Sequence, residues 1–537
     1  MSDSKSSWSF HWQPSHILPT ASQLKQLCEI LRADIFPPRA VTSSLQAFLD
    51  QSPPELAHYD TEILNLEMRL AGLKSDRSSI EFYRDGCKNV FAPVRRLPTE
   101  LLVEIFDLCA PPGADEISES TTMVEEMDRI GKRHLFQISK VCSRWYRIVM
   151  NTPRLWSTLV IDTHAWGHYS FSSKLVALAA SSLERSGGAP LNLQIALEPN
   201  YPSERLVLDL LLKHCHRWKT VYLWVHPAAL QAIASVKGNL PLLEDLSVNS
   251  ATNSDRPSID AFQIAPRLKT AGIAGFPSHV PTLPWQQLSH FSYENNGLSD
   301  QIWLSMLPFL PAHASCEVTL HPVEVTTPLR LTPISSVLST LDLKLPNAWV
   351  PAKTSALLGD VLGCLTLPDL LDLRVNHDGG PPPRWNRTQF SEFASRSSLG
   401  NTLRSLELST MIEEDELLEC LADLSSLSAL YLWDNWDHAC TLITDTLLKR
   451  LTFTPGQLNL VPHLNFTAFN STMRFGDIPF WDFVISRIET GRSPLGPLSV
   501  NVGYLPHCAR ELQIDVLTRA SELQRRGDLH FSAAVEA

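Results

Sequence analysis

The sequence predicts an α/β protein in which a helical N-terminal region precedes a long array of strand and helix repeats. Two amphipathic segments, separated by a Pro-Pro-Gly stop and an acidic run, predict the helical region. Short apolar segments of the form Leu-x-x-Leu-x-Leu, which recur through the rest of the chain, predict the repeats. With 537 residues, of which 44% are hydrophobic and 19% are charged, the chain is globular and too long for one small core.

Residues 1–57 show no clear hydrophobic period, and we expect them to be poorly ordered or loosely docked. Residues 58–90 are predicted to form a helix, because apolar side chains fall at alternating spacings of three and four with one polar break. This seam consists of Ile63, Leu66, Leu70, Leu73, Arg77 and Ile80. Two interpretations stay open: a single amphipathic helix packed against the domain that follows, which we favour, or a short coiled-coil dimer.

Two short helices are predicted within residues 91–160. Pro98 fits the first turn of the first helix, where a missing N–H costs nothing. The apolar residues of that helix, at helical spacing, are Leu101, Leu102, Ile105, Phe106 and Cys109. The second helix follows apolar positions from Leu135 to Ile148 and ends before Pro153. The insert between them, residues 111–131, is acidic and is expected to be a solvated loop.

The motifs of this region are Leu97-Pro98, Ile105-Phe106, Val141-Cys142-x-x-Trp145 and Pro153-x-Leu155-Trp156. They resemble the F-box of fungal F-box proteins, many of which also carry a helix directly before the Leu-Pro motif. The resemblance implies binding to a Skp-type adaptor and, through it, to a cullin, as in Skp, cullin and F-box ubiquitin ligases. It also implies a set of side chains that face the adaptor or form the F-box core, without separating these roles. The set is Leu97, Pro98, Leu101, Leu102, Ile105, Phe106, Val141, Cys142, Trp145, Leu155 and Trp156.

Residues 161–510 carry the repeated segments. The clearest is Leu427-x-x-Leu430-x-Leu432-x-x-Asn435, which has the pattern of a leucine-rich repeat. The central positions are Val221, Leu246, Ala271, Phe291, Val318, Leu341, Leu373, Leu406, Leu430 and Leu464, with weaker copies at Val318 and Leu464. Their spacing of roughly 20 to 34 residues predicts a curved solenoid of degenerate leucine-rich repeats, each adding one strand to a parallel sheet. A buried α/β domain with less periodic strands is the alternative.

If the leucines point inward, the residues between them lie on the concave face of the predicted sheet. Aromatic residues are enriched at binding hot spots, so Tyr222, Trp224, Tyr431 and Trp433 are candidates for binding a target protein. The alternative is that loops or the C-terminal segment, residues 511–537, cover them. In that segment we expect a helix over 511–526, which caps the last repeat, and a free tail from Ala533 to Ala537.

Charge and cysteine content argue against several classes of partner. A net charge of −12, without clustered Lys and Arg, argues against nucleic-acid binding. The ten cysteines lack paired spacing, which is typical of reduced thiols. The chain contains no apolar stretch of about 18 residues, so the sequence predicts no membrane segment. We therefore expect a cytoplasmic or nuclear protein whose partners are proteins, with no nucleic acid and no membrane among them.

The chain shows no catalytic motif and no Walker-type or dinucleotide glycine motif. His214, Cys215 and His216 lack the second spaced pair of a metal site and are interpreted as the end of a surface helix. The acidic run from Glu413 to Glu416 is interpreted as the first turn of a helix. We therefore expect no catalytic residue, no cofactor and no metal. A hydrolase would need a nucleophile and a base that no motif indicates.

Together these inferences predict a non-catalytic subunit that recruits substrates to a ubiquitin ligase. The F-box would bind the Skp-type adaptor, and the repeats would bind an unknown target protein. The alternative is a scaffold repeat protein whose F-box-like helices pack internally and recruit no ligase. The sequence does not specify the target, a modification or small ligand that recognition needs, the exact repeat boundaries or the oligomeric state.

Overall fold

The computed structural model describes residues 17–33, 36–109, 132–162, 172–197, 202–250, 260–276, 281–294, 302–320, 332–346, 351–378, 382–434, 441–490, 497–505 and 510–535. It divides into two compact units, Met1–Leu101 and Leu102–Ala537. The acidic insert, residues 111–131, lies outside the described residues.

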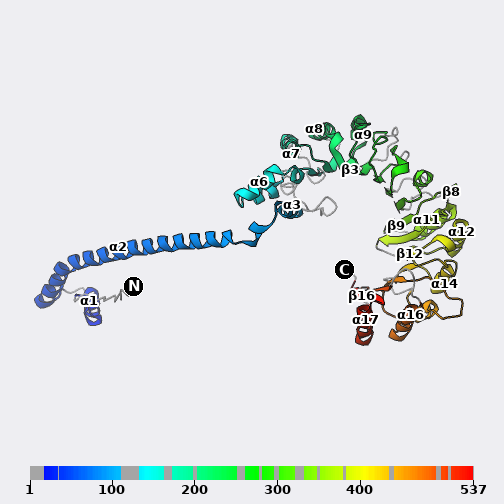
Figure 1. The fold of residues 1–537 in the computed structure, drawn as a ribbon. Coiled ribbons are helices and arrows are strands. Elements are labelled where there is room, and N and C mark those ends of the chain that lie inside the picture. The colour runs from blue at the N-terminus through cyan, green and yellow to red at the C-terminus, as the bar shows by residue number, and fades with distance from the viewer. Residues whose placement is uncertain are drawn as a thin grey trace, which may run out of the picture. The chain divides into compact units, whose positions relative to one another are not determined.

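The first unit is helical. It contains α1 (Ala21–Ala33), α2 (Arg39–Val90) and a short 3₁₀ helix, η1 (Pro93–Arg96) (Figure 1). Helix α2 is 52 residues long, which corresponds to roughly 80 Å at the rise of an α-helix. It contains the whole of the predicted 58–90 helix and begins at Arg39, inside the segment expected to be poorly ordered. Two consecutive prolines, Pro53 and Pro54, lie within it. Because proline usually ends or kinks a helix, the sequence does not predict that the helix continues through them.

The first predicted short helix is present, but the second, predicted as one helix from Leu135 to Ile148, is two helices separated by a turn at residues 140–142. Helix α3 (Thr99–Leu108) starts directly after Pro98 and crosses the boundary between the units. It is followed by α5 (Arg133–Ser139), α6 (Ser143–Asn151) and the 3₁₀ helix η3 (Pro153–Trp156). Thr152 ends α6 in an extended conformation, and Pro153 opens η3, where its fixed φ fits the first turn.

A parallel sheet of fourteen strands forms the rest of the second unit, among the residues that the structure describes. Its strands follow one another in chain order, so every neighbour is the next strand of the sheet along the chain. They are β1 (Thr158–Asp162), β2 (Leu191–Leu197), β3 (Trp218–Val225), β4 (Asp245–Ser250), β5 (Thr270–Ala274), β6 (His290–Glu294), β7 (Ser315–Thr319), β9 (Thr340–Pro346), β11 (Asp372–Asp378), β12 (Ser405–Leu408), β13 (Ala429–Trp433), β14 (Phe466–Ser471), β15 (Leu498–Tyr504) and β16 (Leu529–Val535). Strands β8 (Ile334–Ser335) and β10 (Leu365–Thr366) form a separate pair.

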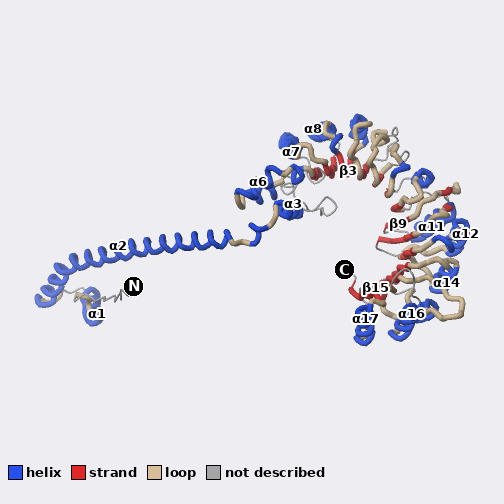
Figure 2. Tube along the Cα trace, in the orientation of Figure 1, coloured by secondary structure: helices blue, strands red, loops and turns tan. Residues whose placement is uncertain are grey.

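Helices connect the strands and lie on one side of the sheet, which curves so that the strands line its inner side (Figure 2). The α-helices are α7 (Ser172–Arg185), α8 (Pro202–Leu212), α9 (Pro227–Ile233), α10 (Ile302–Met306), α11 (Pro351–Cys364), α12 (Arg387–Ser397), α13 (Leu399–Thr402), α14 (Glu414–Ala422), α15 (Asp445–Leu451), α16 (Asp477–Thr490) and α17 (Ile514–Arg526). Helix α14 begins with a capping box made by Glu413 and Glu416, so the predicted acidic first turn is confirmed.

Along each strand, side chains point alternately to a buried face and to an accessible face of the sheet. In β13, Leu430 and Leu432 are fully buried, whereas Tyr431 and Trp433 are half-buried. The buried side chains of successive strands form one continuous core beneath the helices. Each of the eight clearer copies of the leucine pattern forms a strand, from β3 to β6 and in β9, β11, β12 and β13.

The register corrects two predicted central positions. Cys316 of β7 pairs with Phe291 and Leu341, so Cys316, rather than Val318, is central in its strand. Thr467 of β14 pairs with Leu430, so Leu464 precedes the strand instead of lying at its centre. Cys316 and Thr467 are small or polar residues at the inward position where most of the other strands carry a larger apolar side chain. The spacing of leucines therefore assigned the wrong central residue to these two strands.

The C-terminal segment also differs from expectation. Helix α17 lies within the predicted helix, and Gly527, whose φ is +80°, ends it. The chain then enters β16, which pairs along its whole length with β15. The predicted free tail is therefore wrong for Ala533 to Val535, which belong to the last strand. The prediction also missed β1, β2 and β15.

Candidate functional site

Helix α3 carries two apolar faces with opposite exposures. Leu102 and Phe106, four residues apart, are buried. Leu101, Ile105 and Leu108 follow the neighbouring face of the helix and have 51%, 42% and 85% of their surface exposed. The apolar residues at helical spacing therefore form a core face and an accessible face. We call the accessible set, Leu101, Ile105 and Leu108, the α3 stripe.

Aromatic packing fixes the buried face. The ring of Phe106 lies 4.9 Å, centroid to centroid, from the ring of Trp145 on α6. Trp156 is fully buried, and its indole Nε1 donates a hydrogen bond of 2.9 Å to the Val149 carbonyl oxygen. The rings of Phe136 and Trp156 meet edge to face at 5.4 Å. These contacts hold α3, α5, α6 and η3 together, so the orientation of the α3 helix follows from side chains that the motifs contain.

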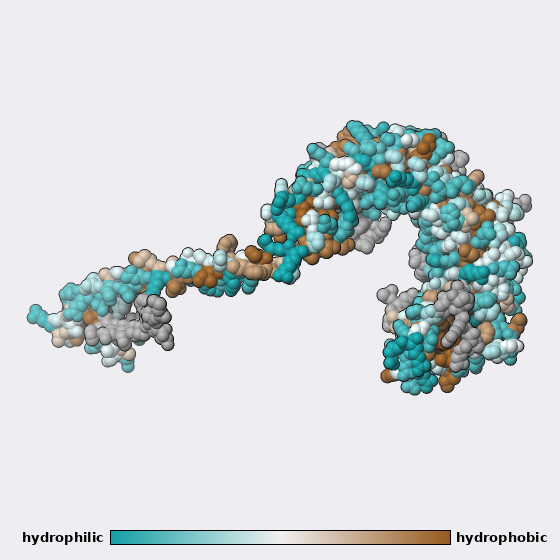
Figure 3. Space-filling view, in the orientation of Figure 1, coloured by the Kyte–Doolittle hydropathy of each residue, from teal (hydrophilic) through white to brown (hydrophobic). Residues whose placement is uncertain are grey.

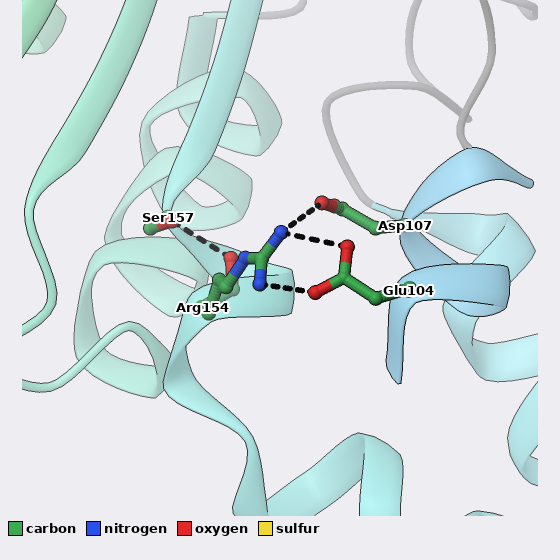
Figure 4. A network of polar contacts seen from close by, with 4 residues as sticks. All are labelled: Glu104, Asp107, Arg154 and Ser157. Atoms are coloured by element: carbon green, nitrogen blue, oxygen red, sulfur yellow. Dashed lines mark hydrogen bonds and ion pairs between the residues drawn. The ribbon is translucent and has the colours of Figure 1, made fainter. Parts of the chain in front are cut away.

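An ion network joins η3 to α3 (Figure 4). The Arg154 guanidinium donates to both carboxylate oxygens of Glu104, at 2.5 and 3.0 Å, and to Asp107 at 3.3 Å. The carbonyl of Arg154 accepts a 2.7 Å hydrogen bond from the Ser157 hydroxyl. The hydrogen bond to Glu104 is the main cause that raises the pKa of Arg154 above its usual value. Because Arg154 and Glu104 are exposed and Asp107 is only half-buried, solvent screens the network, which orients η3 more than it stabilises it.

Two basic residues at the start of α5 are held in unfavourable surroundings. Burial lowers the pKa of Lys132 to about 8, against a smaller opposing effect of Asp107. Burial and the charge of Lys132 lower the pKa of His134 to about 4, and its Nδ1 has no hydrogen-bond partner among the described residues. Lys132 also has a positive φ of 54°, a conformation that favours glycine. Both groups are therefore poorly solvated next to the core of this region.

The structure divides the predicted F-box set by burial. Leu102, Phe106, Leu155 and Trp156 are buried, and Leu97, Cys142 and Trp145 are half-buried. Pro98, Leu101, Ile105 and Val141 are exposed. Sequence analysis did not single out Leu108, Glu104, Asp107 or Arg154. Arg154 occupies the variable position of the Pro-x-Leu-Trp motif, and Glu104 and Asp107 are one helical turn apart, which is the signal that could have found them.

The predicted target-binding aromatics lie on the inner side of the sheet. Tyr222 and Trp224 of β3 have 44% and 48% of their surface exposed. Tyr431 and Trp433 of β13 are half-buried, and the Tyr431 ring packs on Phe466 of the next strand at 4.9 Å. The two pairs are on strands separated by several others, so the structure does not bring all four residues together.

Charged side chains occupy this inner face between the two aromatic pairs. Lys344 lies 2.7 Å from Glu317 on the neighbouring strand β7. Arg374 of β11 forms ion pairs with Asp372 at 2.8 Å and with Glu407 of β12 at 3.7 Å. The result is a charged row that crosses four adjacent strands, β7, β9, β11 and β12.

Asp342 lies within this row, paired in register with Glu317 on one side and Arg374 on the other. Its Oδ1 is buried and has no hydrogen-bond partner among the described residues. Loss of solvent raises the pKa of Asp342, and the nearby Lys344 opposes the rise. Loss of solvent raises the pKa of Glu407 as well. The inner face thus contains carboxylates that its own cations do not fully compensate.

Residues 94–162 match the F-box-like family model. The F-box-like domain therefore contains α3, α5, α6 and η3, which the aromatic packing and the Arg154 network join, and the strand β1. The sheet from β2 onward lies outside the match. No curated protein matches the chain.

The part of the chain that the structure describes contains neither a candidate membrane-spanning helix nor a candidate metal cluster. None of the helices there is long and apolar enough to cross a membrane. No group of three or more His, Cys, Asp and Glu side chains in the described ranges could hold a metal ion. Cys215 is buried in a short 3₁₀ helix, Cys215–Arg217, between His214 and His216, and its sulfur accepts from the Asn239 amide at 3.2 Å. These three residues are part of the fold of the second unit.

Proposed function

We propose that this protein is a substrate receptor of a Skp, cullin and F-box ubiquitin ligase. The observation that carries the proposal is the exposed α3 stripe on an F-box-like domain, beside the neighbouring face of α3 on which Leu102 and Phe106 are buried. An exposed apolar stripe on a helix whose neighbouring face packs into a core is the geometry of a helix that a partner covers. The partner is a Skp-type adaptor, which in turn binds a cullin.

The α3 stripe also determines which side chains to change. Trp145 packs against Phe106, so replacing it would damage the fold as well as the surface. Leu101, Ile105 and Leu108 can be truncated with little loss of core packing, because they are exposed. At a buried interface each contributes apolar area worth about 1–2 kcal/mol, so the triple alanine variant should bind the adaptor at least about 100-fold more weakly.

The test is co-purification of the full chain with a Skp-type adaptor, followed by titration of the purified components. Wild type should bind stoichiometrically, and the Leu101→Ala, Ile105→Ala, Leu108→Ala variant should lose binding at unchanged helical content. Leu206→Ala on α8 is the matched control, because it removes a leucine of similar exposure, 57%, from another helix of the chain. Failure of well-folded wild type to bind would refute the proposal and favour the scaffold alternative.

The sheet is the proposed target-binding part. We infer that its strand and helix units are degenerate leucine-rich repeats that form a solenoid, and that the target binds the inner face. The support is the strict chain order of parallel strands and the exposure of Tyr222 and Trp224 on that face. Catalysis then belongs to an enzyme carried by another subunit, and this chain acts by raising the local concentration of its target. A cytoplasmic or nuclear location follows from such a role.

Target binding can be tested separately from adaptor binding. Complexes are isolated from cells through the adaptor with wild type or with a Tyr222→Ala, Trp224→Ala variant, and the ubiquitinated proteins are compared. Loss of specific targets with retained adaptor would support the inner face as the binding surface. Retention of every target would contradict it. Leu206→Ala again serves as the control on the helical side.

A further inference from the structure

Helix α2 has an apolar seam that is longer than the predicted one and that its own unit does not bury. No residue of α2 is buried, and its apolar side chains are exposed between polar ones (Figure 3). Because the helix runs from Arg39 to Val90, the alternating spacing of three and four residues between seam positions continues on both sides of the predicted seam. The full seam is Leu45, Leu49, Ser52, Leu56, Tyr59, Ile63, Leu66, Leu70, Leu73, Arg77, Ile80, Arg84 and Cys87. In a coiled coil, a seam of this kind is covered by the seam of a second helix.

The charges beside the seam argue against a parallel, in-register pair of α2 helices. In a coiled coil the seam residues alternate between heptad positions a, here Ile63, Leu70 and Arg77, and d, here Leu66, Leu73 and Ile80. In the parallel arrangement, each residue that directly precedes an a position faces the residue five places later in the other helix. The facing pairs would be Glu55 with Asp60, Glu62 with Glu67, Arg69 with Lys74, and Asp76 with Glu81. Every one is a pair of like charges. Arg77 and Arg84, both at a positions, would also face their own copies, so this arrangement is repulsive along most of its length.

One antiparallel register reverses this pattern. When Leu70 packs opposite Leu73 of a second copy, Ile63 packs opposite Ile80. In an antiparallel coiled coil, a residue that precedes an a position faces another such residue, so Arg69 faces Asp76. A residue that follows a d position likewise faces another such residue, so Glu67 faces Lys74. By two-fold symmetry each of these contacts occurs twice.

The same register places both seam arginines against residues other than themselves. Arg77 packs opposite Leu66, and Arg84 packs opposite Tyr59, whose ring can accept a cation on its face. One unfavourable pair, Asp60 with Glu81, remains at each end of the overlap.

Neighbouring antiparallel registers are disfavoured by the same charges. A shift of one heptad toward the N-terminus places Arg69 opposite Arg69 and Glu67 opposite Glu67. A shift toward the C-terminus places Asp76 opposite Asp76 and Lys74 opposite Lys74. Like charges in direct opposition destabilise both shifted pairs. The charges therefore select one register, whose overlap runs from Pro53 to Val90.

We propose that α2 is a self-association element, which pairs with α2 of a second copy of this chain in the antiparallel register centred on Leu70 and Leu73. The interface consists of the apolar seam, with two Glu67–Lys74 pairs and two Arg69–Asp76 pairs beside it. It does not depend on the F-box-like domain or on the sheet. Antiparallel pairing places the C-terminal ends of the two α2 helices, which lead into the two F-box-like domains, at opposite ends of the coiled coil.

The experiment is sedimentation equilibrium of the full chain, because the mass reports association directly. Glu67→Lys distinguishes the two orientations. In the antiparallel pair the introduced lysine repels Lys74 of the other copy at two places, whereas in a parallel pair it would be attracted to Glu62. Adding Lys74→Glu restores the antiparallel pairs. Asp50→Lys is the matched control, since it makes the same change of charge on the same helix outside the overlap.

We expect wild type and the Asp50→Lys control to form dimers of equal affinity. Glu67→Lys should raise the dimer Kd about tenfold or more, and the Glu67→Lys, Lys74→Glu variant should return it to the wild-type value. Wild type that stays monomeric up to about 0.1 mM would overturn the proposal. A tighter Glu67→Lys dimer, or one of unchanged affinity, would overturn the antiparallel register. Helical content by circular dichroism verifies that each variant is folded.

Discussion

Arg154 and Glu104 form a two-point contact in which both carboxylate oxygens of Glu104 accept a hydrogen bond from the Arg154 guanidinium, at 2.5 and 3.0 Å. The contact connects residues fifty positions apart in the sequence, from the helix that begins the F-box-like domain to the turn that precedes its first strand. A two-point contact fixes angle as well as distance. It therefore sets how η3 meets α3 even though both side chains are exposed.

Arg154→Ala should lower the free energy of unfolding by no more than about 1 kcal/mol, because solvent screens an exposed ion pair. The test is a double-mutant cycle with Glu104→Ala, followed by chemical denaturation. We expect a coupling energy of about 0.2–1 kcal/mol. A coupling energy above about 2 kcal/mol would show that the contact stabilises the domain rather than merely orienting η3.

The F-box-like domain should lose stability on mild acidification through His134. Its folded pKa of about 4 lies below the usual value of 6.5, so the unfolded chain binds a proton first. The stability from the neutral imidazole is present above about pH 6.5 and is lost as the pH falls toward 4.

Since His134 is only half-buried, we expect a loss of about 1 kcal/mol after allowance for solvent screening. Thermal unfolding of wild type and His134→Asn between pH 7 and 4.5 measures it, and the variant should show a shallower pH dependence. His313→Asn, at an exposed histidine, is the control and should follow wild type. Equal pH profiles for all three proteins would contradict the prediction.

Asp434→Asn should strongly destabilise the second unit. The buried Asp434 carboxylate accepts five hydrogen bonds, including those from the backbone N–H groups of Leu442, Ile443 and Thr472 at 2.8 to 2.9 Å. An amide replaces one acceptor oxygen with a donor and leaves buried N–H groups without partners. We expect a loss of about 3 kcal/mol or more in chemical denaturation. The exposed control Asp415→Asn should change stability by less than about 0.5 kcal/mol, and an equally small change in Asp434→Asn would refute this account.

Asp342→Asn should have the opposite effect and stabilise the protein at neutral pH. Burial raises the folded pKa of Asp342, so the stability from its protonated form is present at acid pH and is lost as the pH rises through that pKa. Removing the charge should therefore raise Tm at pH 7 and have little effect at pH 4.

The gain should stay below about 1 kcal/mol, since water still reaches part of the carboxyl. Thermal unfolding at both pH values measures it, with Asp369→Asn on an exposed turn as the control. A lower Tm for Asp342→Asn at pH 7 would mean that Lys344 and Arg374 compensate the carboxylate more than its orphaned Oδ1 indicates.

Sequence reasoning predicted the strand positions better than it predicted their register. Leucine at alternating positions located β3 to β6, β9 and β11 to β13, because large aliphatic side chains mark the inward face of a strand. It failed where Cys316 and Thr467 occupy that face, and it missed β16, whose two alanines at Ala533 and Ala534 carry little hydrophobic signal. Hydrogen bonding to the neighbouring strand decides that these residues belong to strands, and that contact is formed between residues far apart in the sequence.

The sequence by itself determined the α3 helix, the Leu-Pro and Trp motifs of the F-box-like domain, and the heptad spacing of α2, since each depends on residues within a few turns of one another. Only the tertiary structure decided which motif residues are core and which are surface. Leu101 and Leu102 are adjacent leucines on one helix, yet Leu101 is exposed and Leu102 is buried. Periodicity specifies the faces of a helix, but only long-range packing, here of Trp145 on Phe106, determines which face is covered.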